Sequence, residues 1–320
     1  MLYKQLTSIF LLTITCLVQA GPPTKSANQP NFIIIYTDEM GYADAGPFGH
    51  PLINTPSIDS LADDGQVWTN FYAAASVCPP SRGALLTGKL PVRTGLYGDN
   101  ISVFFPGSKS GIPHSEKTIA EVFQDNRYAT GIFGKWHLGD AKTYYPTRHG
   151  FDEWLGIPYS NDMDWEIEGI TSKNIFTPPE QIAAKYQKIA PRIRENIFEP
   201  DISDWQVPLI SSKTNLDGTF TDLILEKPAN QNLITRRYTE ESVRFMTKAS
   251  SKNKPFFLML SHSMPHVPLF RSSAFANKSE RGLYGDVIEE IDWSVGQIMA
   301  AIDKLNIAQN TYLVFTSDNG

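Results

Sequence analysis

The chain has 320 residues, of which 41% are hydrophobic and 19% charged, and this is the composition of a globular protein. Its length is sufficient for one large α/β domain or two smaller ones. The formal net charge of -6 is spread along the chain and shows no basic excess, which argues against a nucleic-acid-binding surface.

The first residues predict an export signal. Lys4 supplies a positive charge, residues 9–18 form a short apolar run, and Ala20 offers a small residue at a cleavage point. The run is too short to span a bilayer comfortably, so we expect no stable membrane span, although a membrane anchor is the alternative. We interpret residues 1–20 as a signal peptide and residues 21–29 as a linker. The mature protein is then expected in the periplasm or outside the cell of a bacterium, or in the secretory pathway or lysosome of a eukaryote.

Cysteine usage limits the covalent chemistry of the mature chain. Of the two cysteines, Cys16 lies within the expected signal, so only Cys78 would remain. One cysteine cannot build an internal disulfide in an exported protein. Cys78 is therefore either a buried, inert thiol or a residue reserved for chemistry.

Four short apolar runs predict buried strands. They are rich in β-branched or aromatic residues, as expected of strands covered on both faces. These runs are 32–36, 128–133, 256–260 and 312–315. Amphipathic segments between them predict helices at 115–126, which Ser115 would open, at 239–249 and at 286–305. This alternation predicts an α/β fold with a mostly parallel sheet and helices on both faces.

The segment 161–227 differs from the rest of the chain. Its periodicity is weaker and it contains several prolines. We interpret it as an insertion of loops and short elements over a site.

Polar residues follow each apolar run directly, beginning at Thr37, Gly134, Ser261 and Thr316. A single such group is most simply a solvated strand end. The carboxyl ends of parallel strands, however, meet at one edge of a sheet, where ligands bind. Asp38, Glu39, Asp318 and Asn319 offer only oxygen ligands there, which suit calcium or magnesium better than zinc. These residues predict a site for a hard divalent cation.

The strongest local signal surrounds Cys78. Two prolines follow it, as is favoured in the first turn of a helix, and Gly88 is suited to end that helix. Cys78 would then lie at a helix N-terminus, which favours an anion. Arg82 lies about one turn later and can pair with an anionic group there. The alternative is a buried apolar Cys78 with Arg82 as a surface cation.

The pattern Cys78-x-Pro80-x-Arg82, followed by Leu86-Thr87-Gly88, resembles the signature of type I sulfatases that a formylglycine-generating enzyme reads in the unfolded chain. Other matching segments are 30–38, 41–42, 55–59, 61–62, 134–139, 285–292 and 317–320. The resemblance covers nearly all of residues 30–320 and is closest to the arylsulfatase and N-acetylgalactosamine-6-sulfatase branch. It implies an alkaline-phosphatase-like catalytic domain that hydrolyses an aryl sulfate or a sulfated carbohydrate.

The resemblance also implies a nucleophile and a cation. Cys78 would become formylglycine, whose hydrate attacks sulfur with one hydroxyl and releases sulfate with the help of the other. Calcium, or alternatively magnesium, would be bound by Asp38, Glu39, Asp318, Asn319 and residue 78. Relatives usually carry aspartate at the position of Glu39, whose extra methylene alters its reach.

Further residues would bind the substrate and move protons. Arg82 would orient the formylglycine hydrate, and Lys135 and Ser160 would contact sulfate. His137 would take up a proton in the elimination step, whereas His266 would help to bind the substrate and protonate the leaving oxygen. The remaining histidines are expected in loops or on the surface, except that His262 follows the third apolar run closely. They are His50, His114 and His149.

Relatives continue beyond the motif that ends this chain at Gly320, so we expect residues 30–320 to be a catalytic domain truncated at its C-terminus. A phosphomonoesterase or phosphodiesterase of the same superfamily is an alternative function. A truncated pseudoenzyme that binds sulfated ligands without turnover is another. The expected partners are a sulfated small molecule or glycan and, during maturation, the formylglycine-generating enzyme.

Overall fold

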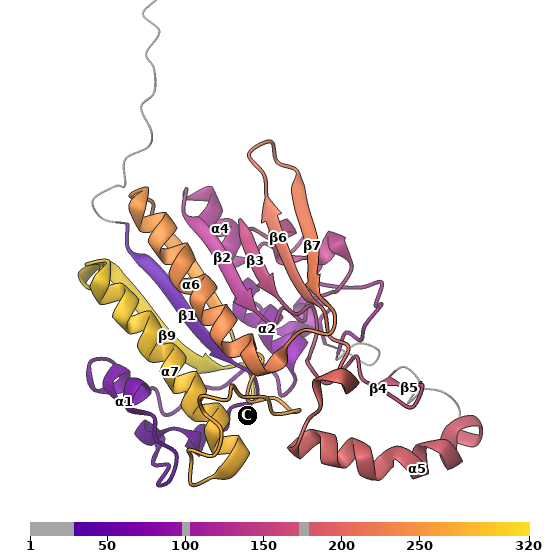
Figure 1. Ribbon diagram of the computed structural model, residues 1–320. Coiled ribbons are helices and arrows are strands. Elements are labelled where there is room, and N and C mark those ends of the chain that lie inside the picture. Colours follow the sequence, from indigo (N-terminus) through magenta and orange to yellow (C-terminus); the bar gives the residue numbers. More distant parts are fainter. Residues whose placement is uncertain (1–28, 98–102, 173–178) are drawn as a thin grey trace, which may run out of the picture.

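A seven-stranded sheet forms the centre of the computed structural model, which describes residues 29–97, 103–172 and 179–320 (Figure 1). Its strand order is β7-β6-β3-β2-β8-β1-β9. These strands are β1 (Asn31–Thr37), β2 (Ala129–Gly134), β3 (Glu153–Gly156), β6 (Leu209–Thr214), β7 (Phe220–Glu226), β8 (Phe256–Ser261) and β9 (Thr311–Ser317). The short strands β4 (Glu166–Ile167) and β5 (Ile170–Thr171) form a separate antiparallel pair.

All four predicted strands lie in this sheet and are parallel to one another. β1 pairs with β8 and β9, and β2 pairs with β8. β8 is buried along its whole length, whereas the edge strand β9 leaves Tyr312 and Val314 exposed, so the prediction of a strand covered on both faces is wrong for residues 312–315. β2 also pairs in parallel with β3, which was not predicted because it has only four residues and begins with Glu153.

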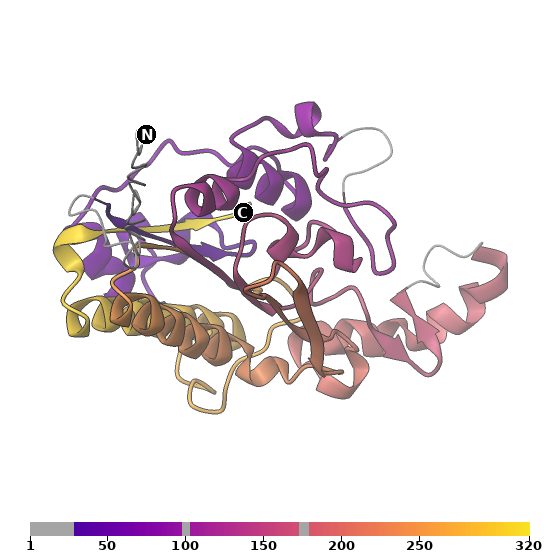
Figure 2. The same cartoon turned by 90° about the horizontal axis from the view of Figure 1, so that it is seen from above.

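Helices cover both faces of the sheet, as predicted (Figure 2). α6 and α7 lie on one face, whereas α2 and α4 lie on the other, and both α6 and α4 contact β2 and β8. Each face has its own apolar cluster. The helices are α1 (Pro56–Asp63), α2 (Cys78–Thr87), α3 (Pro91–Thr94), α4 (Ile119–Asp125), α5 (Pro179–Phe198), α6 (Ile234–Ser251) and α7 (Gly282–Lys304).

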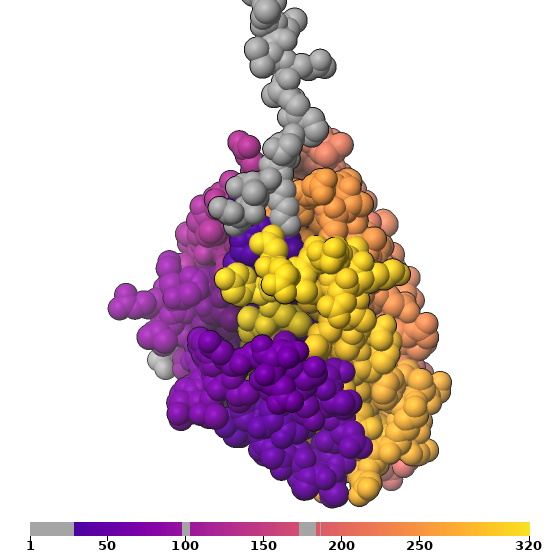
Figure 3. All heavy atoms as spheres, turned by 90° about the vertical axis from the view of Figure 1, so that its left-hand side faces the viewer, coloured from indigo at the N-terminus to yellow at the C-terminus, as the bar shows by residue number. Residues whose placement is uncertain are grey.

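The N-terminal and C-terminal parts of the described chain lie side by side (Figure 3). β1 and β9 pair directly, and α1 packs against α7. The Asp292 carboxylate on α7 accepts hydrogen bonds from the backbone N–H groups of Ser57 and Ile58 in the first turn of α1. These N–H groups have no partner within their own helix, so Asp292 fixes the start of α1 against α7.

The predicted helix start at Ser115 is wrong. α4 begins after Thr118, whose hydroxyl accepts a hydrogen bond from the Glu121 N–H at 3.1 Å. The Glu121 carboxylate in turn accepts from the Thr118 N–H at 2.7 Å. This reciprocal capping satisfies two N–H groups at once, so Thr118 rather than Ser115 starts the helix.

The interpretation of residues 161–227 as loops and short elements is also wrong in part. This segment contains α5, a helix of 20 residues, and the hairpin of β6 and β7. β6 pairs antiparallel with β3, so the hairpin extends the central sheet. β7 is an edge strand with side chains exposed on both faces, and it therefore lacks the alternation that identifies a half-buried strand.

The expected signal peptide, residues 1–20, lies outside the described residues, as does all of the linker 21–29 except residue 29. Within the described ranges, no helix has the length and apolar character needed to cross a membrane.

Candidate active site

The carboxyl ends of four parallel strands bring the predicted polar residues together. Asp38 follows β1, Lys135 follows β2, Ser261 ends β8 and Asp318 follows β9. The backbone ties these ends to one another: the Asp318 N–H donates to the Thr37 carbonyl at 3.0 Å. Because the strands run in the same direction, residues far apart in sequence meet at one edge of the sheet.

Cys78 is the first residue of α2, as predicted. Two prolines occupy the first turn, and Gly88 ends the helix in the left-handed conformation with φ of 65°. Cys78 is buried, and its Sγ lies 3.3 Å from Oδ1 of Asp38. Burial and the nearby carboxylates of Asp38 and Asp318 hold the pKa of this thiol well above its ordinary value, despite the opposing effect of Lys135. The unmodified side chain is therefore a neutral thiol and a poor nucleophile.

Arg82 joins the two carboxylates from inside the protein. Its Nε donates to Oδ2 of Asp318 at 2.9 Å, and its Nη2 donates to Oδ1 of Asp38 at 3.1 Å. Its Nη1 donates to the Lys135 carbonyl at 3.0 Å and to the Ser261 hydroxyl at 2.8 Å. The side chain is only 1% exposed, so its interpretation as a surface cation is wrong. Arg82 is a fully engaged buried cation that fixes the geometry of this edge.

A continuous chain of hydrogen bonds leads from Asp38 to His266. The fully buried Lys135 donates through Nζ to Oδ2 of Asp38 at 2.6 Å and to the Ser160 hydroxyl at 3.1 Å. Ser160 Oγ lies 3.2 Å from Nε2 of His266. Because Nδ1 of His266 faces the Val267 carbonyl at 2.6 Å, Nδ1 carries a proton and Nε2 can accept from Ser160. Ser160 therefore links the buried lysine to the histidine ring.

The two aspartates differ in their protonation equilibria. Burial would raise the pKa of Asp38, but Lys135 and Arg82 together hold it well below its usual range. Burial and the neighbouring charge of Asp38 raise the pKa of Asp318 to about 7. Two carboxylates held this close repel each other unless positive charge lies between them. The guanidinium of Arg82, which donates to both carboxylates, supplies positive charge at this position.

The ligand set fits a hard cation. Ligand atoms of Asp38, Cys78 and Asp318 all lie within 4.8 Å of one another. The amide oxygen of Asn319 is buried and has no hydrogen-bond partner among the described residues. A buried oxygen without a partner is costly, and a cation bound between these groups would satisfy it.

Glu39 reaches a different part of the same edge. Its backbone N–H donates to Oδ1 of Asp318 at 3.1 Å, whereas its carboxylate lies 3.5 Å from Nε2 of His266. Glu39 is 41% exposed at its side chain, in contrast to the fully buried Asp38 and Asp318. Its ligand atom also lies within 4.8 Å of those of Cys78 and His266, so it is placed between the aspartates and the histidine.

His137 lies beside this network. Its Nε2 is 3.2 Å from the Phe104 carbonyl, which can only accept a hydrogen bond, so the ring proton lies on Nε2 and Nδ1 has the free lone pair. Nδ1 has no hydrogen-bond partner in the described part of the chain. Burial, reinforced by Lys135 and Arg82, lowers the pKa of His137 well below its ordinary value. The ring is therefore neutral and can act as a base. The backbone of His137 is strained, with a positive φ of 61°.

Sequence reasoning missed several residues that support the site. Ser261 accepts from Arg82 and donates to the Lys135 carbonyl at 2.8 Å, and the Ser81 hydroxyl donates to the Asp318 carbonyl. The only available signal for each was its position at a strand end or next to Arg82. His262 is fully buried and contacts the Ser294 hydroxyl at 3.2 Å. His149 lies in a turn, as expected of a loop residue, but it is not on the surface, because it is only 1% exposed and its ring stacks on that of the exposed His114.

Comparisons with known proteins agree with this arrangement. The Sulfatase family model matches residues 30–320. Arylsulfatase A of Bos taurus is 37% identical over 97% of this chain and 55% of its own length. N-acetylgalactosamine-6-sulfatase of Sus scrofa is 35% identical over 93% of this chain and 51% of its own length. The chain thus spans about half the length of these curated relatives.

A solved structure shares the fold. The crystal structure of Ps i-CgsB in complex with k-i-k-neocarrahexaose is 32% identical and superposes with a TM-score of 0.67. The match covers 92% of this chain and 59% of the other. Together with the family match over residues 30–320, these similarities show that the chain belongs to the sulfatase family.

Proposed function

We propose that the protein hydrolyses sulfate esters, using formylglycine made from Cys78 and a calcium ion bound at the carboxyl edge of the sheet. The observation that carries this proposal is the meeting of Cys78 with Asp38 and Asp318, whose ligand atoms lie within 4.8 Å of one another. Cys78 is also buried at a helix N-terminus, where an anion is favoured. These features support a site built for an anionic substrate.

The charge of the site favours a sulfate ester. Among the carboxylate, guanidinium and ammonium groups of the site, the ionised carboxylates of Asp38, Glu39 and Asp318 exceed the cations Arg82 and Lys135 by one negative charge. A divalent cation reverses this balance to one positive charge. A sulfate monoester carries one negative charge and neutralises it, whereas a phosphate monoester carries nearly two at neutral pH. We therefore favour sulfate over phosphate as the group that is transferred.

Calcium would be bound by Asp38, Asp318, Asn319 and residue 78, with Glu39 as a further candidate and magnesium as the alternative ion. When bound, it would polarise a sulfate oxygen and offset developing negative charge. Formylglycine, once hydrated, would supply a geminal diol as the nucleophile.

The residues of this chain would position the substrate and move protons. Arg82 would hold residue 78 and the two aspartates in fixed relative positions. Lys135 and Ser160 would bind sulfate oxygens. In its protonated form, His266, which lies between Ser160 and Glu39, would give the proton on Nε2 to the leaving oxygen. His137 would take up a proton at its unpartnered Nδ1.

Mass spectrometry of the peptide that contains residue 78 tests this proposal. The full-length protein is expressed with a formylglycine-generating enzyme, its expected maturation partner, and assayed with 4-nitrophenyl sulfate. We expect an aldehyde at residue 78 and hydrolysis that is lost in Cys78→Ala. Active protein that contains only unmodified cysteine would contradict the mechanism.

Parallel assays separate the alternative functions. A phosphomonoesterase or phosphodiesterase would prefer 4-nitrophenyl phosphate or its diester over the sulfate. A pseudoenzyme would bind inorganic sulfate in calorimetry and turn over none of these compounds, even when residue 78 is modified. A clear preference for the sulfate ester is the outcome that we expect.

The substrate class and the compartment are part of the same proposal. The relatives named above include an arylsulfatase and a sugar sulfatase, so we propose an aryl sulfate or a sulfated carbohydrate as substrate. An exported location follows from the expected signal peptide in residues 1–20, and N-terminal sequencing of the mature protein tests it.

A further inference from the structure

Within the described residues, Cys78 belongs to two groups of ligand atoms at the carboxyl edge of the sheet. Asp38 and Asp318 complete the first group, and Glu39 and His266 complete the second, with the atoms of each group within 4.8 Å of one another. The two carboxylates of the first group suit a hard cation. The second group combines a thiol, an imidazole and a carboxylate, which are the ligand types that zinc prefers. The second group therefore differs in chemistry from the site proposed for calcium.

The imidazole of His266 is oriented to bind a metal ion. Its Nδ1 faces the Val267 carbonyl at 2.6 Å, so Nδ1 carries the proton and Nε2 has the free lone pair. Histidines that bind metals commonly donate the other ring N–H to a carbonyl or carboxylate in this way. Nε2 lies 3.2 Å from the Ser160 hydroxyl, and a metal–nitrogen bond would replace this one hydrogen bond.

Glu39 supplies both the carboxylate and the opening of the group. Its Oε1 lies 3.5 Å from Nε2 of His266. Two ligand atoms at tetrahedral positions around zinc, with bonds of about 2.0–2.1 Å, lie about 3.3 Å apart, so the observed separation is close to the required one. The Glu39 side chain is 41% exposed, whereas Cys78 and His266 are buried. An ion can thus enter from the solvent at Glu39 and be held by buried ligands.

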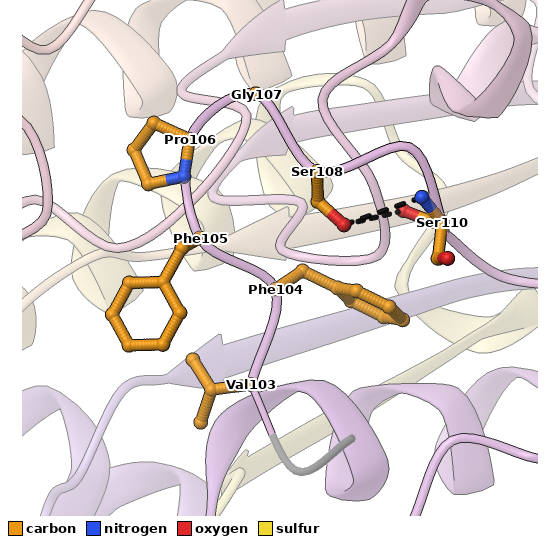
Figure 4. A pocket seen from close by; sticks show the side chains of 7 residues that line it. All are labelled: Val103, Phe104, Phe105, Pro106, Gly107, Ser108 and Ser110. Atoms are coloured by element: carbon orange, nitrogen blue, oxygen red, sulfur yellow. Dashed lines mark hydrogen bonds between the residues drawn. The ribbon is translucent and has the colours of Figure 1, made fainter. Parts of the chain in front are cut away.

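A neighbouring hollow offers no such ligand set. It has a volume of about 330 Å³ and is lined by residues 103–108 and Ser110 (Figure 4). None of these residues is a histidine, cysteine, aspartate or glutamate. The Ser108 hydroxyl already accepts from the Ser110 N–H at 3.2 Å and donates to the Ser110 carbonyl at 3.3 Å. The hollow has room for an ion but lacks the ligands that zinc requires.

We propose that the unmodified protein binds zinc at Cys78, Glu39 and His266, with water as the fourth ligand. Zinc forms a bond with Sγ of Cys78, and the charge of the ion displaces the thiol proton into the solvent. This inference goes beyond the proposed function, because it concerns the chain before residue 78 is converted. It holds whether or not the matured protein hydrolyses sulfate esters.

Cobalt(II) spectroscopy tests the sulfur ligand directly. Cobalt(II) can replace zinc in tetrahedral sites, and its bond to a thiolate gives a charge-transfer band in the near ultraviolet. The full-length protein is expressed without a formylglycine-generating enzyme, and mass spectrometry verifies that residue 78 is cysteine. We expect cobalt chloride to produce the band in the metal-free protein and zinc chloride to remove it. A parent protein without the band would overturn the proposal.

Two variants assign the band to one cysteine. Cys78→Ala removes the ligand atom, and Cys78→Ser replaces sulfur with a harder oxygen in a side chain of similar size. Both variants keep Cys16, the other cysteine of the chain, so neither should show the band if Cys78 is the ligand. A band that persists in both variants would place cobalt at another residue and contradict the proposal.

Calorimetry with zinc chloride tests all three ligands. We expect Cys78→Ala to raise the Kd of zinc about hundredfold, and Glu39→Gln and His266→Gln to raise it about tenfold each. His114→Gln is the matched control, because His114 is exposed and its ring stacks on that of His149, outside the group. It should leave the Kd of zinc and the cobalt band unchanged. Zinc affinity that is unaffected by Cys78→Ala, or that falls equally in His114→Gln, would overturn the proposal.

Discussion

The parallel half of the sheet and the β6–β7 hairpin use charged residues in opposite ways. At the ends of β1 and β9, the carboxylates of Asp38 and Asp318 are fully buried and share the guanidinium of Arg82. On the hairpin, Asp222 pairs with Arg148 near the surface, and both side chains retain some exposure. A buried charge depends on all of its partners, whereas a partly exposed one can be rehydrated when a partner is removed. The comparison predicts that removing one charge lowers the free energy of unfolding more at the buried site than on the hairpin.

The largest effect is expected at Arg82. Arg82→Met would leave two buried carboxylates without their shared cation, and we expect a loss of about 3–5 kcal/mol in the free energy of unfolding. Urea denaturation followed by circular dichroism measures this change. Arg82→Lys, which keeps the charge but loses the forked geometry, should recover only part of the stability. A change below about 1 kcal/mol in Arg82→Met would mean that the carboxylates are not buried as described.

The second-largest change in stability is expected when the pH falls and His149 would be protonated. This residue lies apart from the proposed metal ligands. Burial, followed by the charges of His114 and Arg148, lowers the pKa of His149 to about 4. The folded state thus resists protonation, whereas the unfolded state protonates near pH 6.5. The contribution of the neutral His149 ring to the free energy of unfolding is fully present above about pH 6.5. It is lost as the pH falls from about 6.5 towards 4, with a total loss of about 3 kcal/mol.

Urea unfolding of the parent protein and of His149→Phe between pH 7.5 and pH 4.5 tests this prediction. The variant keeps an aromatic ring between His114 and Trp136 but cannot be protonated. Its stability relative to the parent protein should therefore rise as the pH falls. Parallel pH profiles for the two proteins would show that His149 does not titrate in this way.

Calcium should stabilise the parallel half. At a concentration of about 100 times its Kd, an ion that binds only the folded state adds about 2.7 kcal/mol, and chelation removes this gain. Thermal unfolding with calcium or with a chelator measures the shift in Tm. The shift should disappear in Asp318→Asn and persist in Asp222→Asn, whose carboxyl lies on the hairpin. Equal shifts in both variants would place the ion elsewhere.

The smallest effect is expected on the hairpin. Asp222 accepts two hydrogen bonds from Arg148, at 2.8 and 2.6 Å. Asp222→Asn should cost about 1–2 kcal/mol, because the pair is partly solvated and bidentate. The kcat/KM for 4-nitrophenyl sulfate should stay within about twofold, since β3, β2 and β8 separate the hairpin from β1. A tenfold loss of activity would instead couple the hairpin to the site.

The sequence by itself determined the elements that depend on local physics. Apolar runs rich in β-branched and aromatic residues became β1, β2, β8 and β9. Prolines after Cys78 and a glycine at position 88 bounded α2. Since parallel strands share the direction of their carboxyl ends, the meeting of Asp38 with Asp318 could also be expected.

Tertiary structure alone decided which elements became neighbours and which side chains were buried. The edge strand β7 lacks a one-sided apolar pattern, and its place depends on pairing with β6. His149 is buried because His114 and Trp136 pack against it, and Phe105 lines a hollow because residues 104 and 107 bind the segment after β2. These outcomes arise from contacts between residues distant in sequence, and such contacts form only when the chain is folded.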